Sequence, residues 1–158
     1  MRLKSYWVNL APALLLSSLL AQPVANSVLT AQAPPHTVLK KGGEAEIKVI
    51  VSLRPGYHVN SNKPADDYLI PLRLSFDTTP LEAVSVQFPQ PKMEKYAFSE
   101  KPLSVYSGSF EIKAKVKAKA DARMGMNFAN AKLRYQACDE NSCLPPKTIE
   151  VRIPFDLN

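Results

Sequence analysis

Apolar and charged residues alternate without interruption from residue 110 to residue 119. Every second position from Phe110 to Ala118 is apolar, and the positions between them carry charges: Glu111, Lys113, Lys115, Lys117 and Lys119. A period of two is that of an extended strand with one buried face, whereas a helix would scatter the lysines around its circumference. Residues 44–53 show the same alternation. The chain must therefore build much of its fold from half-buried β-strands.

Shorter segments of the same character follow along the chain. The segments predicted to be strands are 44–53, 57–60, 72–76, 84–88, 110–118, 131–137 and 149–155. Fourteen prolines against five glycines disfavour a helical bundle, because proline interrupts helix interiors. Short strands separated by turn residues are typical of two antiparallel sheets packed face to face. We therefore predict an all-β fold, an immunoglobulin-like antiparallel β-sandwich of about seven or eight strands.

The first 25 residues have the pattern of a secretory signal peptide. Arg2 and Lys4 precede an apolar stretch from Val8 to Ala21, which has the length of a signal-peptide core and is short for a membrane span. Cleavage is expected between residues 21 and 33, and an uncleaved anchor helix is the alternative. The predicted organisation is a signal peptide at 1–25, a lead-in at 26–43 and one sandwich domain at 44–158.

Export and charge narrow the possible functions. An exported chain reaches an oxidising compartment in which a disulfide can persist. Removing residues 1–25 takes away two cations and no acid, so the net charge falls from +6 to +4, too weakly basic to indicate a nucleic-acid partner. Two cysteines and two histidines leave too few ligands for a metal cage, so neither a metal nor a cofactor is predicted. The sequence contains no Gly-x-Ser-x-Gly or His-Glu-x-x-His hydrolase motif.

Both cysteines lie in one short segment between the last two predicted strands. Cys138 and Cys143 flank four turn-forming residues, Asp-Glu-Asn-Ser. A hairpin connection brings its ends to within about 5–6 Å, which suits a disulfide. The acidic residues beside the cysteines raise the thiol pKa, because a carboxylate disfavours a nearby thiolate. The pair is therefore better suited to be attacked by a partner's thiolate than to act as a strong oxidant.

Two interpretations of this disulfide remain open on the residues alone. A loop of six residues constrains the unfolded chain by only about 2 kcal/mol, which makes it a weak staple and favours a redox role. The other interpretation is a structural hairpin disulfide in a secreted, non-catalytic immunoglobulin-like binding domain. A reduction potential separates the two, since structural disulfides lie below about −300 mV and exchange-active ones lie higher.

Three segments resemble a known family. Tyr135-Gln136-Ala137-Cys138 followed by Cys143-Leu144-Pro145-Pro146 resembles the N-terminal (alpha) domain of DsbD, the thiol:disulfide interchange protein. Residues 55–59 and 105–108 resemble two further segments of that family, in the same order. The resemblance implies an immunoglobulin-like fold, a periplasmic location and a role as a component of a protein-disulfide reductase.

The resemblance also implies partners. The domain would receive electrons from a thioredoxin-like domain and pass them to a periplasmic disulfide isomerase or a cytochrome c maturation protein. It would meet the membrane only through these partners. Exchange would pass through a mixed disulfide, for which the resemblance nominates Cys138 as the sulfur linked to the partner.

Other residues are expected to support the two cysteines. Gln136 shares a strand face with Cys138 and lies close to the active site in the family. Within the long loop at 89–102, residues 92–101 are in the position of the family's cap loop, with Tyr96 and Phe98 as candidate shields. The remaining supporting candidates are Tyr135 and Tyr57. A general-base role for His58 is disfavoured, because no aspartate partner is evident in the sequence.

Overall fold

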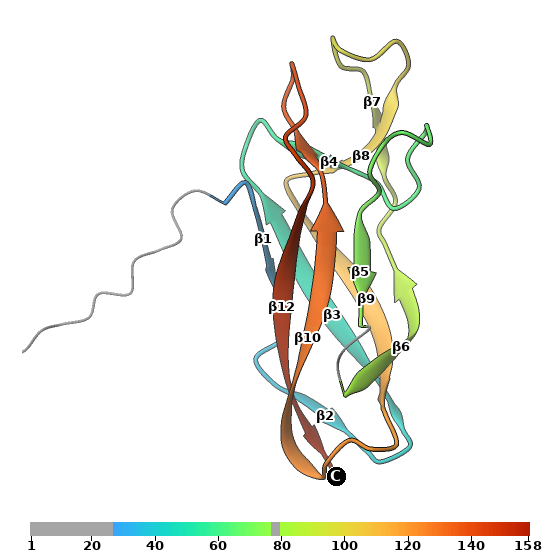
Figure 1. Ribbon diagram of the computed structural model, residues 1–158, viewed down its shortest axis with the longest axis vertical. Helices are drawn as coiled ribbons and strands as arrows, with labels where there is room; N and C mark the ends of the chain where they lie inside the picture. The colour runs from blue at the N-terminus through green and yellow to red at the C-terminus, as the bar shows by residue number, and fades with distance from the viewer. Residues whose placement is uncertain (1–26, 77–79) are drawn as a thin grey trace, which may run out of the picture.

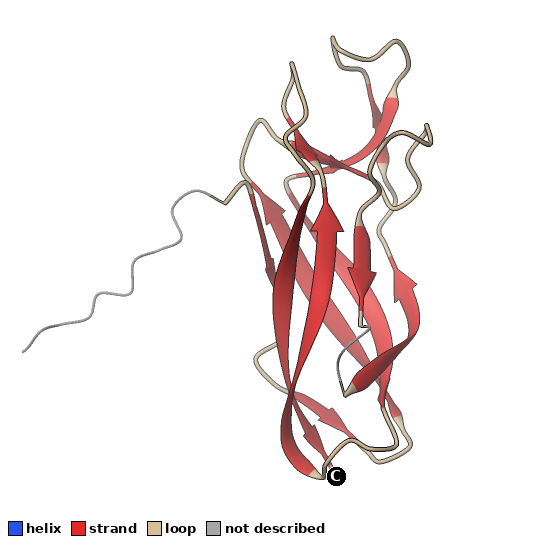
Figure 2. Cartoon of the chain, viewed as in Figure 1, coloured by secondary structure: helices blue, strands red, loops and turns tan. Residues whose placement is uncertain are grey.

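The computed structural model describes residues 27–76 and 80–158, and the predicted signal peptide lies outside them. This part of the chain contains strands and loops and no helix (Figure 2), so it also contains no helix that could cross a membrane. The all-β prediction is confirmed. The twelve strands are β1 Leu29–Gln32, β2 Thr37–Leu39, β3 Glu44–Leu53, β4 His58–Asn60, β5 Arg73–Ser75, β6 Leu81–Gln87, β7 Lys92–Glu94, β8 Leu103–Ser107, β9 Ser109–Ala118, β10 Gly125–Tyr135, β11 Ala137–Cys138 and β12 Lys147–Leu157.

Two four-stranded sheets form the sandwich (Figure 1). One has the order β1-β3-β9-β6 and the other has the order β2-β12-β10-β5. All neighbouring strands in them are antiparallel except β2 and β12, which run parallel. The immunoglobulin-like β-sandwich is thereby confirmed as the architecture.

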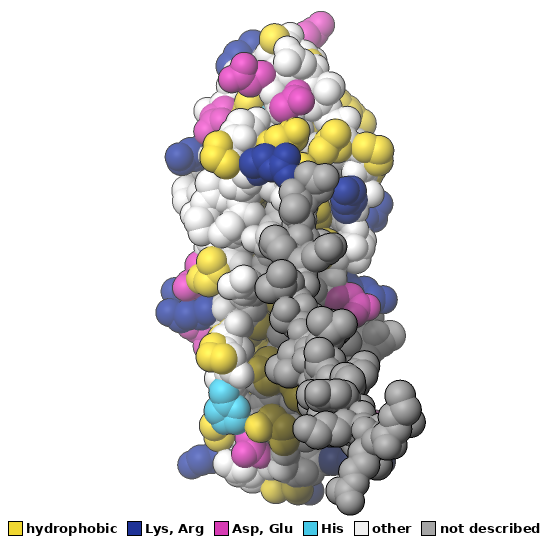
Figure 3. Space-filling model, turned by 90° about the vertical axis from the view of Figure 1, so that its left-hand side faces the viewer, with side chains coloured by type: hydrophobic (Ala, Val, Ile, Leu, Met, Phe, Trp, Pro, Cys, Tyr) yellow, Lys and Arg dark blue, Asp and Glu magenta, His cyan; other side chains and the backbone are white. Residues whose placement is uncertain are grey.

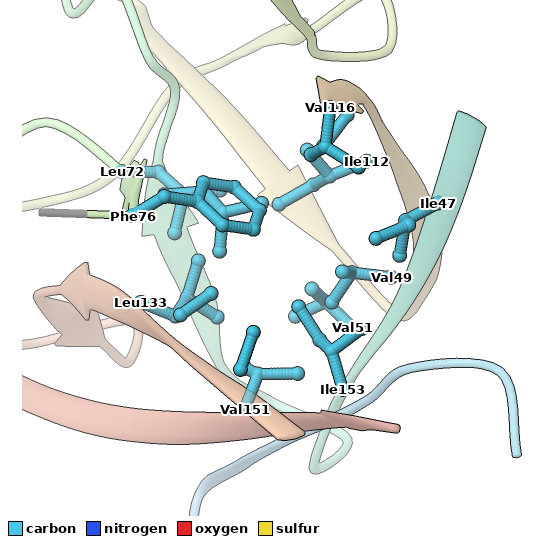
Figure 4. Close-up of a cluster of buried hydrophobic side chains, with 14 of the residues drawn as sticks. Ile47, Val49, Val51, Leu72, Phe76, Ile112, Val116, Leu133, Val151 and Ile153 are labelled. Atoms are coloured by element: carbon cyan, nitrogen blue, oxygen red, sulfur yellow. The ribbon is translucent and has the colours of Figure 1, made fainter. Parts of the chain in front are cut away.

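The core lies between the two sheets, where the alternating apolar residues meet (Figure 4). Ile47, Val49 and Val51 of β3 point toward Val151 and Ile153 of β12, and all five are buried. The charged residues between them face solvent, as the period of two requires. The outward lysines of β9 pair with acidic neighbours, and their ion pairs are Lys113–Glu111, Lys115–Glu44 and Lys117–Glu82.

The structure has more strands than the seven or eight expected, and residues 26–43, expected to be a lead-in, contain two of them. Four strands (β1, β2, β7 and β8) are not among the predicted segments, and β11 overlaps the predicted segment 131–137 only at Ala137. Each of these five strands has at most five residues, too few for a clear period of two. β1 and β2 lie within 26–43, which the sequence predicts to be a lead-in. They bury Leu29 and Leu39 in the core, so this segment is part of the sandwich.

A third, smaller sheet lies at one end of the sandwich, opposite the end at which the C-terminus lies (Figure 1). Its order is β11-β4-β8-β7, and it is built from continuations of the sandwich strands. β9 continues backward through Gly108 into β8, and β10 continues through Gln136 into β11. Gly108 has a φ of +66°, a conformation that residues with a side chain rarely adopt, and this lets the chain change sheets there. Cys138 lies in this small sheet, and Cys143 is bridged to it.

Candidate functional site

Cys138 and Cys143 form a disulfide, with an S–S distance of 2.03 Å and a Cα–Cα distance of 3.9 Å. The two cysteines differ sharply in exposure. Cys138 ends β11 and is 0% exposed, whereas Cys143 lies in the loop beyond it and is exposed. A partner's thiolate can therefore reach the sulfur of Cys143 and not that of Cys138.

Hydrogen bonds from Asp139 shape the loop between the cysteines. Its Oδ1 accepts bonds from the backbone N–H groups of Asn141 and Ser142, both at 2.8 Å, and its own N–H donates to the Ser142 carbonyl at 2.9 Å. These bonds hold the pKa of the Asp139 carboxyl below its usual value, so it stays ionised at neutral pH. A negative charge is thus fixed immediately beside the disulfide.

β11 pairs with β4, and this pairing sets His58 directly opposite Cys138. His58 is only 2% exposed, and its Nε2 has no hydrogen-bond partner among the described residues. Burial lowers the pKa of the imidazole, while the carboxylates of Glu94 and Asp139 oppose this shift. Two carboxylates from segments distant in the sequence therefore act on His58 through their charge, and the sequence did not reveal them.

An aromatic stack covers His58. The ring of Tyr96 lies 3.9 Å from the imidazole, centroid to centroid, with 15° between their planes, and Phe98 stacks beyond at 5.6 Å from Tyr96. Tyr96 donates its hydroxyl hydrogen bond to Glu94. Burial and this carboxylate raise the pKa of the Tyr96 hydroxyl above its usual value, so it remains protonated. The structure thus places both expected shielding residues over the neighbour of Cys138.

A pocket of about 230 Å³ opens beside the exposed cysteine. The Nε2 of Gln136 donates a hydrogen bond to the Leu144 carbonyl at 3.2 Å. This bond links the two sides of the cysteine loop at the pocket. The pocket is lined by Tyr68, Leu69, Phe98, Ser99, Leu103, Gln136 and Cys143. Tyr68 is 74% exposed, so most of its large aromatic side chain faces solvent. Sequence analysis missed Tyr68, Leu69 and Leu103, because their segments have no periodicity and no motif.

Acidic and basic side chains are interspersed at this end of the molecule (Figure 3). The acidic ones from the cap loop and the cysteine loop include Glu94, Glu100, Asp139 and Glu140, and the cap loop also carries Lys92, Lys95 and Lys101. The carboxylate of Asp139, next to Cys138 along the chain, disfavours the thiolate of this cysteine when the disulfide is reduced.

The other supporting candidates lie away from the pocket. Tyr135 is 3% exposed within the sandwich core, where burial raises the pKa of its hydroxyl. Tyr57 packs against the same core. Neither lines the pocket beside Cys143. No group of three or more His, Cys, Asp or Glu residues able to hold a metal occurs in residues 27–76 and 80–158.

Replacing both cysteines by alanine should leave the domain folded. The disulfide closes a loop of six residues, so its loss removes about 2 kcal/mol of chain-entropy stabilisation from a typical total of about 5–15 kcal/mol. The double variant should melt cooperatively less than about 10 °C below the oxidised wild type. Circular dichroism melts would show this, and an unfolded variant at room temperature would mean that the disulfide is structural.

Comparisons with known proteins agree with this geometry. The family model described as thiol:disulfide interchange protein DsbD, N-terminal, matches residues 25–154. No curated protein matches the chain.

Two solved structures are similar. The N-terminal periplasmic domain of ScsB from Proteus mirabilis is 16% identical with a TM-score of 0.50, and the match covers 78% of this chain and 43% of that one. The chain therefore spans less than half of that structure, and the likeness shows the fold alone. A family 123 glycoside hydrolase from Clostridium perfringens is 14% identical with a TM-score of 0.31 over 84% of this chain and 27% of that one, which carries no argument.

Proposed function

The chain belongs to the family of DsbD N-terminal domains, and from this membership we propose that it is a periplasmic thiol–disulfide exchange module. It relays reducing equivalents between thioredoxin-like proteins through the Cys138–Cys143 disulfide. The observation that carries the proposal is the exposure of Cys143 at an open apolar pocket, on a disulfide that contributes little to the fold.

The exposures of the two cysteine residues favour the opposite assignment to the one expected from the resemblance. The resemblance nominates Cys138 as the sulfur linked to the partner, but Cys138 is 0% exposed, so an incoming thiolate cannot align with it. In the proposed reaction the donor's thiolate attacks the Cys143 sulfur, the disulfide breaks, and Cys138 leaves with the electron pair and takes up a proton. The donor's second cysteine then attacks the sulfur of the donor's first cysteine in the mixed disulfide, and Cys143 leaves in its reduced form.

The partners in this proposal are defined by chemistry. The donor is a thioredoxin-like domain with a reduced Cys-x-x-Cys pair, and the acceptor is a periplasmic protein disulfide, such as that of an isomerase or a cytochrome c maturation protein. The pocket beside Cys143 would receive the apolar residues that flank a partner's cysteine. Carboxylates around the pair keep the reduced cysteines from reacting indiscriminately.

A trapping experiment with two single-cysteine variants tests the proposal. The Cys138→Ala and Cys143→Ala variants are each activated as the thionitrobenzoate mixed disulfide and mixed with a reduced thioredoxin-like domain that retains only its first active-site cysteine. The Cys138→Ala variant should form a covalent adduct within seconds to minutes, because its sulfur is exposed, and reductant should release it.

The Cys143→Ala variant is the matched control and should form little or no adduct. Intact mass spectrometry identifies the species in both cases. Absence of any reductant-sensitive adduct from either variant would remove the relay and favour the structural disulfide of a secreted binding domain. An adduct from Cys143→Ala alone would mean that Cys138 is the sulfur linked to the partner.

A further inference from the structure

His58 and Cys138 stand directly opposite each other across the β4–β11 pair. Directly opposite residues of an antiparallel pair point to the same face of the sheet, with Cβ atoms about 4.5–5.5 Å apart. Both side chains are buried, and the Nε2 of His58 has no hydrogen-bond partner among the described residues. An unpartnered imidazole nitrogen in a residue that pairs with a buried cysteine requires an explanation, because buried polar atoms are normally satisfied.

Cys138 needs a proton acceptor in the reaction proposed above. After Cys143 has formed a mixed disulfide with an acceptor protein, Cys138 must attack Cys143 to release that protein. Only a thiolate attacks efficiently, and burial together with the carboxylate of Asp139 disfavours the thiolate of Cys138. Water cannot reach a side chain that is 0% exposed without an opening of the structure.

We propose that His58 is the general base that takes the proton from Cys138 when this thiol resolves the mixed disulfide on Cys143. The inference rests on the relay and adds a residue to it. As the Cys138 sulfur forms its bond to the Cys143 sulfur, the bond from Cys143 to the partner breaks, and the partner's sulfur leaves with the electron pair. The proton moves from Cys138 to His58 and then to water or to the departing thiolate. In the reverse direction His58 returns the proton to the leaving Cys138.

The groups around His58 suit this exchange of a proton. Burial keeps the resting imidazole neutral, and neutral imidazole is the form that can accept a proton. The carboxylates that face it are Glu94 from β7 and Asp139 from the cysteine loop, and they stabilise the imidazolium once it forms. Tyr96 covers it from the cap loop as a neutral hydroxyl, and Ser107 lies opposite it on β8.

The experiment uses the reduced protein and one equivalent of dithiobis-nitrobenzoate, with no protein partner, so its outcome is independent of the trapping experiment. Two molecules of thionitrobenzoate are released in turn: the first when Cys143 attacks the reagent, the second when Cys138 resolves the mixed disulfide. His58→Phe keeps an aromatic ring under Tyr96 and removes the base. His36→Phe is the matched control, because His36 is exposed next to β2, far from the cysteines in the fold (Figure 1).

In His58→Phe the second release should be slower by about 10²-fold or more near neutral pH, with the first release unchanged. The deficit should shrink as the pH rises, because hydroxide then deprotonates the thiol more often during the local openings that expose it. His36→Phe should match the wild type in both phases. An unchanged second phase, or a deficit equal at every pH, would overturn the proposal in favour of a packing role. Circular dichroism checks that each variant is folded. If His58→Phe does not fold, His58→Gln takes its place and is judged by the same criteria.

Discussion

Phe155→Ala should lower the free energy of unfolding by about 3–5 kcal/mol, the usual cost of removing a buried phenylalanine. Phe155 lies on β12 with its side chain fully buried in the core between the two sheets. For a domain of this length the loss corresponds to a melting temperature lower by about 10–20 °C. Chemical denaturation and thermal melts of the wild type and of Phe155→Ala measure this loss of stability.

Phe128→Ala is the matched control for this prediction. Phe128 lies on β10, in the strand that pairs with β12, but it is 51% exposed, and the guanidinium of Arg152 lies over its ring, 4.0 Å from the ring centre. Its loss should remove about 0.5–1 kcal/mol from this cation–π contact. Equal destabilisation by the two variants would contradict a core that lies between the two sheets.

The two thiols of the reduced protein should differ by about 10²-fold or more in their rate of reaction with iodoacetamide. Cys143 is exposed, whereas Cys138 becomes reachable only when β11 separates from β4. A local opening that costs about 3 kcal/mol is reasonable for a two-residue strand and slows the reaction by about 10²-fold.

Peptide mass spectrometry after timed alkylation assigns the label to each cysteine. The same reaction in denaturant is the control, since unfolding should bring the two rates to within a few-fold of each other. Equal rates in the folded protein would mean that Cys138 is accessible, and the assignment of Cys143 as the attacked sulfur would lose its basis.

The long strands of the sandwich are predictable from the sequence because each has enough residues to show a period of two. β3 and β9 each have ten residues, and their buried positions are the ones that the alternation predicts. Among the short strands, β4 and β5 fall within predicted segments, whereas β1, β2, β7 and β8 do not, since three to five residues carry no clear period. For this reason the segment of β1 and β2 has the pattern of a lead-in, although Leu29 and Leu39 complete the core.

For the site, the sequence predicts the pair of cysteines and the aromatic residues of the cap loop, because both depend on neighbours along the chain or on a motif. The difference in exposure between Cys138 and Cys143 could not be predicted, since it arises from the pairing of β11 with β4. The surroundings of His58 escape prediction for the same reason. Its carboxylate neighbours, Glu94 and Asp139, are 36 and 81 positions away along the chain.

The six-residue ring closed by the disulfide has a consequence for the direction of electron flow. The ring lies at the tip of one hairpin, and neither cysteine belongs to the two sheets of the sandwich. The oxidised and reduced domains are therefore expected to offer a partner nearly the same contact surface. A partner that binds two states equally well favours neither of them. In the proposed relay the difference between the reduction potentials of donor and acceptor alone sets the direction, and the same domain carries electrons equally well either way.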